Sequence, residues 1–335
     1  MATRDDVARL AGVSSSTVSY VISGRRPISA DTQAKVRAAM RELNYTPNAF
    51  ARGLAGARRG VIALHYPHSP QGVSSTEFEY VSAAAEKAQG LGYHLLLWTQ
   101  PLSDTEGLRS LVDQGMVDGV ILMEVTPDDP RIAPMRDSGT PFVLVGTPDA
   151  ADIPTYVDND YADQADQAVA HLAARGCGDF VFLGPDGTSD SRGFGPSLRI
   201  RRELERAALE HGVSCAVHLT PATPLAGRTA LHAIRAQHTA PLAVVSFNEL
   251  AVAGMLYEAA LIGLAVPRDL MVLALNMGSN AAELAQPPVT TLSPEPHQIM
   301  SQAVKALVST TSTGLSEAPR VQLLVRSRLT LRATT

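Results

Sequence analysis

The sequence has little cysteine, few aromatic residues and no long apolar run, and these shortages exclude several classes of protein. Its two cysteines, Cys177 and Cys215, provide no disulfide framework in a chain of 335 residues. The longest nearly apolar run, 250–257, has about eight residues, whereas a transmembrane helix needs roughly 20. The first residues are polar and acidic, unlike a signal peptide. With 45% hydrophobic and 18% charged residues, the chain is expected to be a soluble, globular, cytoplasmic protein.

The formal net charge of −5 conceals a strong asymmetry along the chain. Residues 1–60 contain ten Lys or Arg and four Asp or Glu, a net charge of +6, whereas the other 275 residues contain 18 basic and 29 acidic residues, a net charge of −11. A basic segment attached to an acidic body is typical of a module that binds polyanions. A solvated basic surface is the alternative that charge alone leaves open.

The first 46 residues predict three short helices. Thr3 followed by Asp6 has the pattern of a capping box, and Gly12 suits the left-handed conformation that ends a helix. Ser14 is the predicted N-cap of the second helix and Ser29 that of the third. Three short helices with a glycine turn between the first two predict a helix-turn-helix.

From residue 61 onward, apolar runs alternate with helical stretches. The runs predicted as strands are 61–65, 93–98, 117–123, 141–146, 179–183, 215–219, 242–247, 270–275 and 321–325. The helices predicted between them are 77–90, 104–115, 160–175, 197–211, 225–237 and 249–263. Nearly continuous apolar strands, each followed by a helix, indicate parallel sheets that are covered on both faces. We therefore expect an α/β core of two doubly wound lobes with a cleft between them.

The predicted organisation has three parts. Residues 1–46 form the helix-turn-helix domain, 47–59 a hinge helix and linker, and 60–335 the core. The first lobe is expected to contain about 60–158 plus 290–318, and the second about 159–289 plus 319–335.

The segment 6–56, DVARLAGVSSSTVSYVISGRRPISADTQAKVRAAMRELNYTPNAFARGLAG, resembles the DNA-binding head and hinge of the LacI/GalR (lac repressor and galactose repressor) family of bacterial regulators. The motifs VDGVIL, VDND and PPVTTL extend the resemblance over essentially the whole chain. It implies a homodimeric transcription regulator whose core resembles periplasmic sugar-binding proteins. Its implied partners are double-stranded operator DNA and a small-molecule effector, a sugar or another small metabolite, and it implies no cofactor and no catalytic site.

The second helix of the head is expected to read bases in the major groove. Val18 and Val21 must face inward, which leaves Ser15, Ser16 and Tyr20 exposed at the positions that, by the resemblance, contact bases. Tyr20 stands where the family usually has arginine. The other predicted DNA contacts, of which the first four are expected at phosphates, are Ser14, Ser19, Arg25, Arg26, Thr17 and Ser29. Helix capping is the alternative reading of the serines.

The resemblance also assigns residues in the hinge. Leu54 matches the leucine that wedges into the minor groove at the operator centre, and Asn48 matches a polar hinge contact. Gly53 departs from the family pattern. Glycine inside a helix costs about 1 kcal/mol relative to alanine, so the hinge helix is expected to be less stable than usual.

For the cleft, the resemblance makes Arg201 the residue that holds effector oxygens, with Arg199 as the alternative and a solvated helix face as a third reading. Asn248 matches an effector contact, and Asn276 stands where sugar-binding relatives carry aspartate. An amide there lacks the charge and the two acceptor oxygens of a carboxylate, which argues against a sugar as the effector.

Three further residues complete the predicted effector site. Glu77 replaces an aromatic residue of the family, and Asp158 and Trp98 are expected at strand ends that line the cleft. Ordinary burial at strand ends is the alternative for the last two.

Other chemistry has weaker support. Gly193 and Gly195 give only part of a dinucleotide-binding loop, and His65 and His68 lack a third metal ligand nearby. We therefore expect no metal site and no enzyme. The alternative functions are a solute-binding protein without a DNA function and a nucleotide-dependent enzyme.

Overall fold

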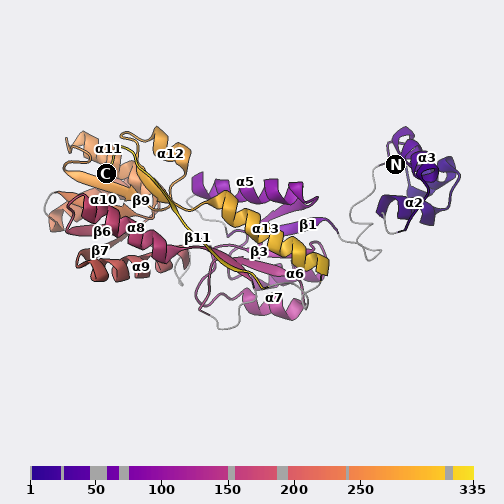
Figure 1. Cartoon of the computed structure of the whole chain (residues 1–335), viewed down its shortest axis with the longest axis horizontal. Coiled ribbons are helices and arrows are strands. Elements are labelled where there is room, and N and C mark those ends of the chain that lie inside the picture. Colours follow the sequence, from indigo (N-terminus) through magenta and orange to yellow (C-terminus); the bar gives the residue numbers. More distant parts are fainter. Residues whose placement is uncertain are drawn as a thin grey trace.

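The computed structural model describes residues 2–23, 26–45, 59–67, 75–149, 155–186, 195–238, 241–313 and 320–335. Within these ranges the chain forms a small helical head followed by two α/β lobes (Figure 1). The predicted DNA contacts Arg25, Asn48 and Leu54 lie outside the described residues. None of the described helices is long and apolar enough to cross a membrane.

The head consists of α1 (Arg4–Ala11), α2 (Ser15–Ser23) and α3 (Ala30–Glu42). Thr3 and Asp6 form the predicted capping box at the start of α1, and Gly12 ends that helix at a φ of 67°. Ser14 caps α2, because its Oγ accepts a hydrogen bond from the Thr17 N–H at 3.2 Å. The predicted helix-turn-helix is confirmed.

One valine from each helix forms the centre of the head. Val7, Val18 and Val36 are fully buried and pack against Ala8 and Ala39. Burial of each valine contributes about 1.5–3 kcal/mol, so these contacts supply a core for the head that is separate from those of the lobes.

The first lobe is a six-stranded parallel sheet in the order β11-β5-β4-β3-β1-β2. Its strands are β1 (Val61–His65), β2 (His94–Trp98), β3 (Gly119–Leu122), β4 (Phe142–Val145), β5 (Tyr156–Asn159) and β11 (Gln322–Val325). Its helices are α5 (Ser75–Gly90), α6 (Thr105–Asp113), α7 (Ile132–Ser138) and α13 (Pro296–Thr313). Apolar residues of α5 and α13 fill the core on one face of the sheet, and those of α6 and α7 fill it on the other.

The second lobe has a sheet in the order β12-β10-β9-β8-β6-β7, in which only β12 is antiparallel to its neighbour. Its strands are β6 (Asp179–Pro185), β7 (Ser214–Thr220), β8 (Leu242–Ser246), β9 (Leu270–Ala274), β10 (Thr290–Ser293) and β12 (Arg328–Thr330). Its helices are α8 (Tyr161–Ala174), α9 (Gly195–His211), α10 (Pro224–Gln237), α11 (Glu249–Leu261) and α12 (Ser279–Leu284). Helices α8 and α9 cover one face, and α10 and α11 cover the other.

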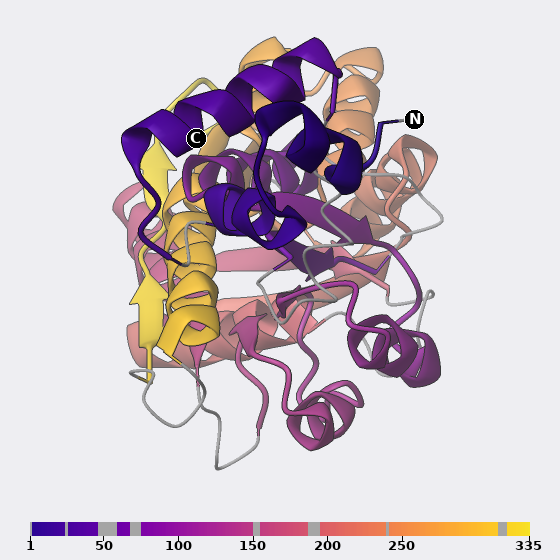
Figure 2. The same ribbon diagram turned by 90° about the vertical axis from the view of Figure 1, so that its right-hand side faces the viewer.

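The chain crosses between the lobes three times, which corrects the predicted lobe boundaries. β10 pairs with β9, so residues 290–293 belong to the second sheet rather than to the first lobe. β11 pairs with β5, so residues 322–325 belong to the first sheet rather than to the second lobe. The second crossing, from β10 to α13, brings a late segment beside an early one, because α13 packs against α5 (Figures 1 and 2).

Each predicted strand and helix of the core overlaps an observed one. The strands β5, β10 and β12 and the helices α7, α12 and α13 are not among the predicted elements. The missed strands have only three or four residues and include polar side chains, so they lack the apolar runs by which the other strands were found.

Candidate functional site

A cavity that opens to solvent lies between the lobes. The carboxyl ends of strands in open parallel sheets are where ligands bind, and residues at or just beyond such ends line this cavity. The aromatic lining residues are Tyr66, Tyr80, Tyr161 and Phe247. The polar and charged ones are Thr76, Glu77, Glu124, Asp158, Asn159, Arg199 and Asn276.

Arg199 of α9 connects the two lobes at this cavity. Its Nη1 donates to the carbonyl oxygens of Val125 at 2.9 Å and Thr147 at 3.1 Å, both in the first lobe. Its Nε lies 3.3 Å from Oδ2 of Asp158 on β5, and its guanidinium stacks over the Tyr161 ring at 5.3 Å from the centroid. Apart from this ion pair at Nε, neither its Nε nor its Nη2, both buried, has a hydrogen-bond partner among the described residues. Arg199 therefore joins the lobes and still has donors to offer.

Asp158 is held from several sides. The Thr147 hydroxyl donates to its Oδ2 at 2.9 Å, and the Asn159 N–H donates to its Oδ1 at 2.8 Å. Burial raises the pKa of Asp158, although the charge of Arg199 acts in the opposite direction. The carboxylate is thus oriented toward the guanidinium by the first lobe itself.

A pair of carboxyl groups forms another part of the lining. The Tyr66 hydroxyl hydrogen-bonds to the carboxyl groups of both Glu77 and Glu124. Burial, and next the charge of Glu77, raise the pKa of Glu124 to about 8, although the Tyr66 hydroxyl and the charge of Arg131 act in the opposite direction. Glu124 also has a φ of 53°, a conformation that is uncommon for a residue other than glycine and that is concentrated at functional sites.

A second bridge between the lobes begins at Glu249, the first residue of α11. Its Oε2 accepts hydrogen bonds from the Ser75 hydroxyl at 2.9 Å, the Thr76 hydroxyl at 3.4 Å and the Gly278 N–H at 3.3 Å. Ser75 begins α5 of the first lobe, and a carboxylate is stabilised at a helix N-terminus. Direct polar contacts therefore join the lobes at Glu249 as well as at Arg199.

The structure brings only some of the predicted effector residues to the cavity. Asp158, Asn276 and Glu77 line it, and Arg201 does not. The Arg201 side chain is 37% exposed and its Nε lies 3.8 Å from Glu205 of the same helix. Two positions apart on an α-helix are about 200° apart around its axis, so Arg199 and Arg201 cannot face the same side. Arg199 replaces Arg201 in the candidate site.

Two further predicted residues lie outside the lining. Asn248 caps α11 through the Ala251 N–H at 3.1 Å, and its Nδ2 donates to the Thr220 carbonyl at 3.2 Å. Trp98, at the end of β2, packs on the first lobe's core next to α6 and α7. Asn248 is therefore a helix cap, and Trp98 is a core residue at the end of a strand.

Tyr66, Glu124 and Asn159 line the cavity and are not among the predicted effector residues. Each lies at the end of a strand or just beyond it, so the rule that ligands bind at the carboxyl ends of parallel strands could have indicated them. No group of three His, Cys, Asp or Glu suited to a metal occurs in the described part of the chain.

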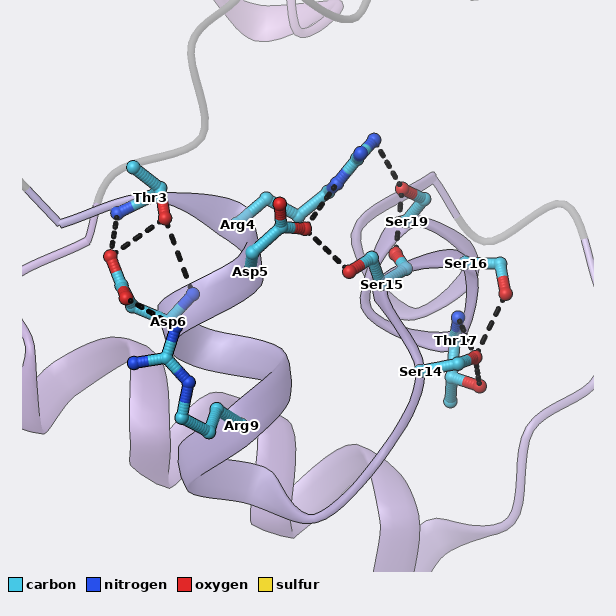
Figure 3. Close-up of polar contacts among 10 residues, drawn as sticks. All are labelled: Thr3, Arg4, Asp5, Asp6, Arg9, Ser14, Ser15, Ser16, Thr17 and Ser19. Carbon is cyan, nitrogen blue, oxygen red and sulfur yellow. Dashed lines mark hydrogen bonds and ion pairs between the residues drawn. The ribbon is translucent and has the colours of Figure 1, made fainter.

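The hydroxyl groups of the head gather at the beginning of α2 (Figure 3). The Ser14 Oγ lies 2.8 Å from that of Ser16 and 2.9 Å from Oγ1 of Thr17, and Ser14 and Ser16 are exposed. Ser15 instead donates to Asp5 of α1 at 2.5 Å, as Figure 3 shows. This end of α2 therefore presents N–H and O–H donors, a combination that suits anionic phosphates.

The remaining predicted contacts of the head have identifiable neighbours. Ser19 donates to the Ser15 carbonyl at 3.1 Å and accepts from Arg4 at 3.4 Å. Ser29 caps α3 through the Thr32 N–H at 3.3 Å. The exposed Arg26 lies over the ring of Tyr20 at 5.7 Å from its centroid.

Two comparisons with protein families identify both parts of the chain. Residues 3–48 match the family described as bacterial regulatory proteins, lacI family. Residues 169–335 match the periplasmic binding protein-like domain.

Among curated relatives, the catabolite control protein A of Staphylococcus xylosus is 25% identical over 335 residues, 98% of both chains. The HTH-type transcriptional regulator MalR of the same species is 31% identical over 191 residues, which span 56% of this chain and 57% of that protein.

Among solved structures, the lac repressor dimer bound to operator and the anti-inducer ONPF has a TM-score of 0.81 at 22% identity, over 100% of this chain and 99% of that one. A complex of the transcriptional regulator CelR with cellobiose has a TM-score of 0.70 at 25% identity, over 100% of both chains. The lac repressor structure therefore has the same fold as this chain, with a helical head and two lobes.

Proposed function

Because the chain belongs to the LacI family of bacterial regulatory proteins, and is thus a DNA-binding transcription regulator with an effector-binding core, we propose that its effector is a small polyhydroxylated molecule bound in the interlobe cavity. Family membership sets aside the two alternatives, a solute-binding protein without a DNA function and a nucleotide-dependent enzyme. Aromatic rings beside carboxylate, amide and guanidinium groups are the side chains that pack on a sugar ring and hydrogen-bond its hydroxyl groups.

The position of Arg199 is the observation that carries this proposal. Its guanidinium lines the cavity, joins the second lobe to Asp158 of the first, and has at Nη2 a buried donor that no described residue accepts from. A ligand that accepts from this donor changes the strength of an interlobe bridge. Such a ligand shifts the population of lobe arrangements, which is the thermodynamic requirement for an effect on a distant DNA-binding head.

The proposed assembly is a homodimer that acts in the cytoplasm, where operator DNA is found. Residues 1–46 would bind the operator, 47–59 would form the hinge, and 60–335 would hold the effector and the dimer contact. The lac repressor structure that shares this fold is described as a dimer bound to operator. Two heads related by twofold symmetry suit a nearly palindromic site.

Arg199→Ala is expected to weaken effector binding by about tenfold to hundredfold, because a hydrogen bond from a charged group contributes roughly 1.5–3 kcal/mol. A thermal-shift screen of mono- and disaccharides would identify a ligand, and calorimetry would give its dissociation constants. Arg201→Ala is the matched control, since it removes an arginine of the same helix that lies outside the cavity, and it should change affinity less than twofold, roughly.

The opposite pattern would contradict the assignment. If Arg201→Ala abolished ligand binding and Arg199→Ala did not, the effector would bind elsewhere. Fluorescence anisotropy on an operator duplex selected from random DNA would show, in parallel, whether either variant alters DNA affinity without ligand.

Tyr20→Ala in α2 is expected to cost about 1–3 kcal/mol of binding free energy at the selected operator and little on scrambled DNA. The reason is that a phenol ring and hydroxyl can contact base edges in the major groove. The exposed Arg26 gives the contrast: Arg26→Ala should weaken binding to both duplexes and lower the slope of log affinity against log salt by about one. Anisotropy titrations at several salt concentrations measure both effects. Equal losses on the two duplexes for Tyr20→Ala would make it a backbone contact.

A further inference from the structure

Ser15, one of the predicted base contacts, is joined to α1 through its hydroxyl group. It is the first residue of α2, and it is partly buried. Its Oγ donates a hydrogen bond to Oδ1 of Asp5 at 2.5 Å (Figure 3). A carboxylate oxygen accepts hydrogen bonds and has no hydrogen to donate. The direction of this contact is therefore fixed, and the serine gives its hydrogen to Asp5.

Arg4 and Ser19 complete a small polar network around this contact. The Nε of Arg4 lies 3.9 Å from the same Oδ1 of Asp5, and its Nη1 donates to Oγ of Ser19 at 3.4 Å. The Ser19 hydroxyl donates in turn to the backbone carbonyl of Ser15 at 3.1 Å. The guanidinium thus lies beside Asp5, where its charge reduces the repulsion between that carboxylate and DNA phosphates.

The contact with Asp5 decides what Ser15 is able to offer to a base. A serine hydroxyl has one hydrogen and two lone pairs, so an unconstrained serine either donates or accepts and distinguishes bases poorly. With its hydrogen engaged by Asp5, Ser15 has only lone pairs left. The amino groups at N6 of adenine and N4 of cytosine are donors in the major groove, whereas O6 of guanine and O4 of thymine are acceptors at the same place on each ring.

We propose that Asp5 is a positioning residue for sequence recognition, because it engages the hydrogen of Ser15 and makes Ser15 accept from the amino group of an adenine or a cytosine. The inference rests on the proposed binding of operator DNA by residues 1–46 and adds the class of base that is read at one position. A carbonyl oxygen at that place would face the lone pairs of Ser15 and the charge of Asp5. The amino group should therefore be preferred over the carbonyl by about threefold to tenfold, as expected for one hydrogen bond.

The base pair that Ser15 contacts is located first. A selection from random DNA with the full chain gives an operator, and duplexes that carry each of the four base pairs at each position are titrated by fluorescence anisotropy. The contacted pair is the one at which Ser15→Ala lowers the base preference, to less than about twofold. If the selection enriches no sequence, or if Ser15→Ala changes the preference at no position, Ser15 reads no base and the inference is overturned.

Deleting the amino group of that base pair shows the direction of the hydrogen bond. Purine in place of adenine lacks the N6 amino group, and 2-pyrimidinone in place of cytosine lacks the N4 amino group. The deletion is expected to weaken binding about threefold to tenfold more with the original chain than with Ser15→Ala. Both proteins meet the same altered duplex, so the effect of a weaker base pair cancels in this comparison. Equal losses with the two proteins would contradict the proposal.

Variants of Asp5 test the role of the carboxylate. Replacing adenine by guanine, or cytosine by thymine, exchanges the amino group for a carbonyl at the contacted pair. Asp5→Ala removes the acceptor, and Asp5→Asn offers a donor in the same shape, so each frees the serine hydrogen and should lower the cost of this exchange to less than about twofold. Asp31→Asn is the matched control in the head, because the Asp31 side chain is 75% exposed and pairs with Lys35 of the same helix.

The double variant of Asp5→Asn and Ser15→Ala shows whether Asp5 acts through the serine. The exchange should cost no less with the double variant than with Ser15→Ala alone. A lower cost with the double variant would mean that Asp5 contacts the base itself, and an unchanged cost with both single Asp5 variants would mean that the carboxylate has no role. Either result overturns the inference. A change in the stability of the head weakens binding to every duplex alike and cancels in a ratio of two affinities.

The outcomes also separate this inference from the proposed function. If Ser15→Ala changes no base preference while Tyr20→Ala does, the head still reads the operator and only the assignment of Ser15 and Asp5 fails. If Ser15→Ala, Tyr20→Ala and Arg26→Ala all leave binding to every duplex unchanged, the proposed contact of the head with DNA fails as well. The effector cavity is tested independently by Arg199→Ala.

Discussion

Replacing Asp129 with alanine is expected to lower the free energy of unfolding by about 3–5 kcal/mol, because it leaves a buried guanidinium without its counterion. Arg131 is fully buried, and Asp129 accepts from its Nε at 2.9 Å and its Nη2 at 2.7 Å. Burial alone raises the pKa of Asp129, but the hydrogen bonds and charge of Arg131 outweigh that effect and leave it lowered. The carboxylate is therefore charged at neutral pH, and urea denaturation of the full chain would measure the loss.

Two further variants test the reason for this loss. Asp128→Ala removes the exposed neighbouring carboxylate and should change the unfolding free energy by less than about 0.5 kcal/mol. The double variant with Asp129→Ala and Arg131→Met should recover part of the stability, because it removes both charges together. A single variant as stable as the original chain would show that Arg131 reaches water or another acid.

The same pair supports the candidate site. Arg131 Nη2 donates to the Met123 carbonyl at 2.8 Å, and Met123 precedes Glu124 in the cavity wall. The buried pair thus holds the backbone from which Glu124 projects. A carboxyl group kept in an uncommon backbone conformation needs such support, since its own conformation costs roughly 1–3 kcal/mol.

The head was predictable from sequence because its determinants are local. The capping box of Thr3 and Asp6, the glycine turn at Gly12 and the caps at Ser14 and Ser29 act within a few residues. The core strands that the sequence predicts are likewise local, because each is a short apolar run that does not fit the spacing of apolar residues in a helix. The conformation of such an element is determined within one short stretch of the sequence.

The cavity was harder to predict because it depends on contacts between distant segments. The resemblance favours Arg201 over Arg199, whereas the phase of α9 against the first lobe places Arg199, and not Arg201, at the cavity. The pairing of β11 with β5 joins residues that are more than 160 positions apart. The periodicity of the sequence gives no information about such a pairing, because the strand order depends on how the cores of both lobes pack.

The buried cluster beside the cavity illustrates the same limit. His65 ends β1, Asp129 and Arg131 precede α7, and nothing in their spacing indicates that they meet. In the structure the Nη1 of Arg131 lies 3.4 Å from Nδ1 of His65, whose Nε2 lies 2.9 Å from the Gln100 carbonyl oxygen. Because a guanidinium can only donate, Nδ1 is the acceptor, and Nε2–H donates to the carbonyl. The imidazole is therefore neutral in the folded protein.

Acidification from pH 6.5 to pH 4 is expected to remove about 3 kcal/mol of stability through His65 alone. Burial, and next the charge of Arg131, lower the pKa of His65 from 6.5 to about 4. Below pH 6.5 the unfolded chain binds a proton that the folded protein does not, so stability falls as the pH falls through this window. A difference of about 2.5 pKa units corresponds to roughly 3 kcal/mol.

The variant His65→Gln isolates this contribution, because Glu124 and the other shifted groups titrate in both proteins. Urea denaturation at pH 7, 6, 5 and 4 should show His65→Gln less stable than the original chain at pH 7 and the gap shrinking steadily toward pH 4. His94→Gln removes an exposed imidazole from β2 and should give a curve parallel to the original one. A constant gap between His65→Gln and the original chain over the whole range would mean that His65 takes up its proton at the same pH in the folded and the unfolded protein. That result would also require the contact between Nδ1 and Arg131 to open, since two N–H donors cannot face each other without repulsion.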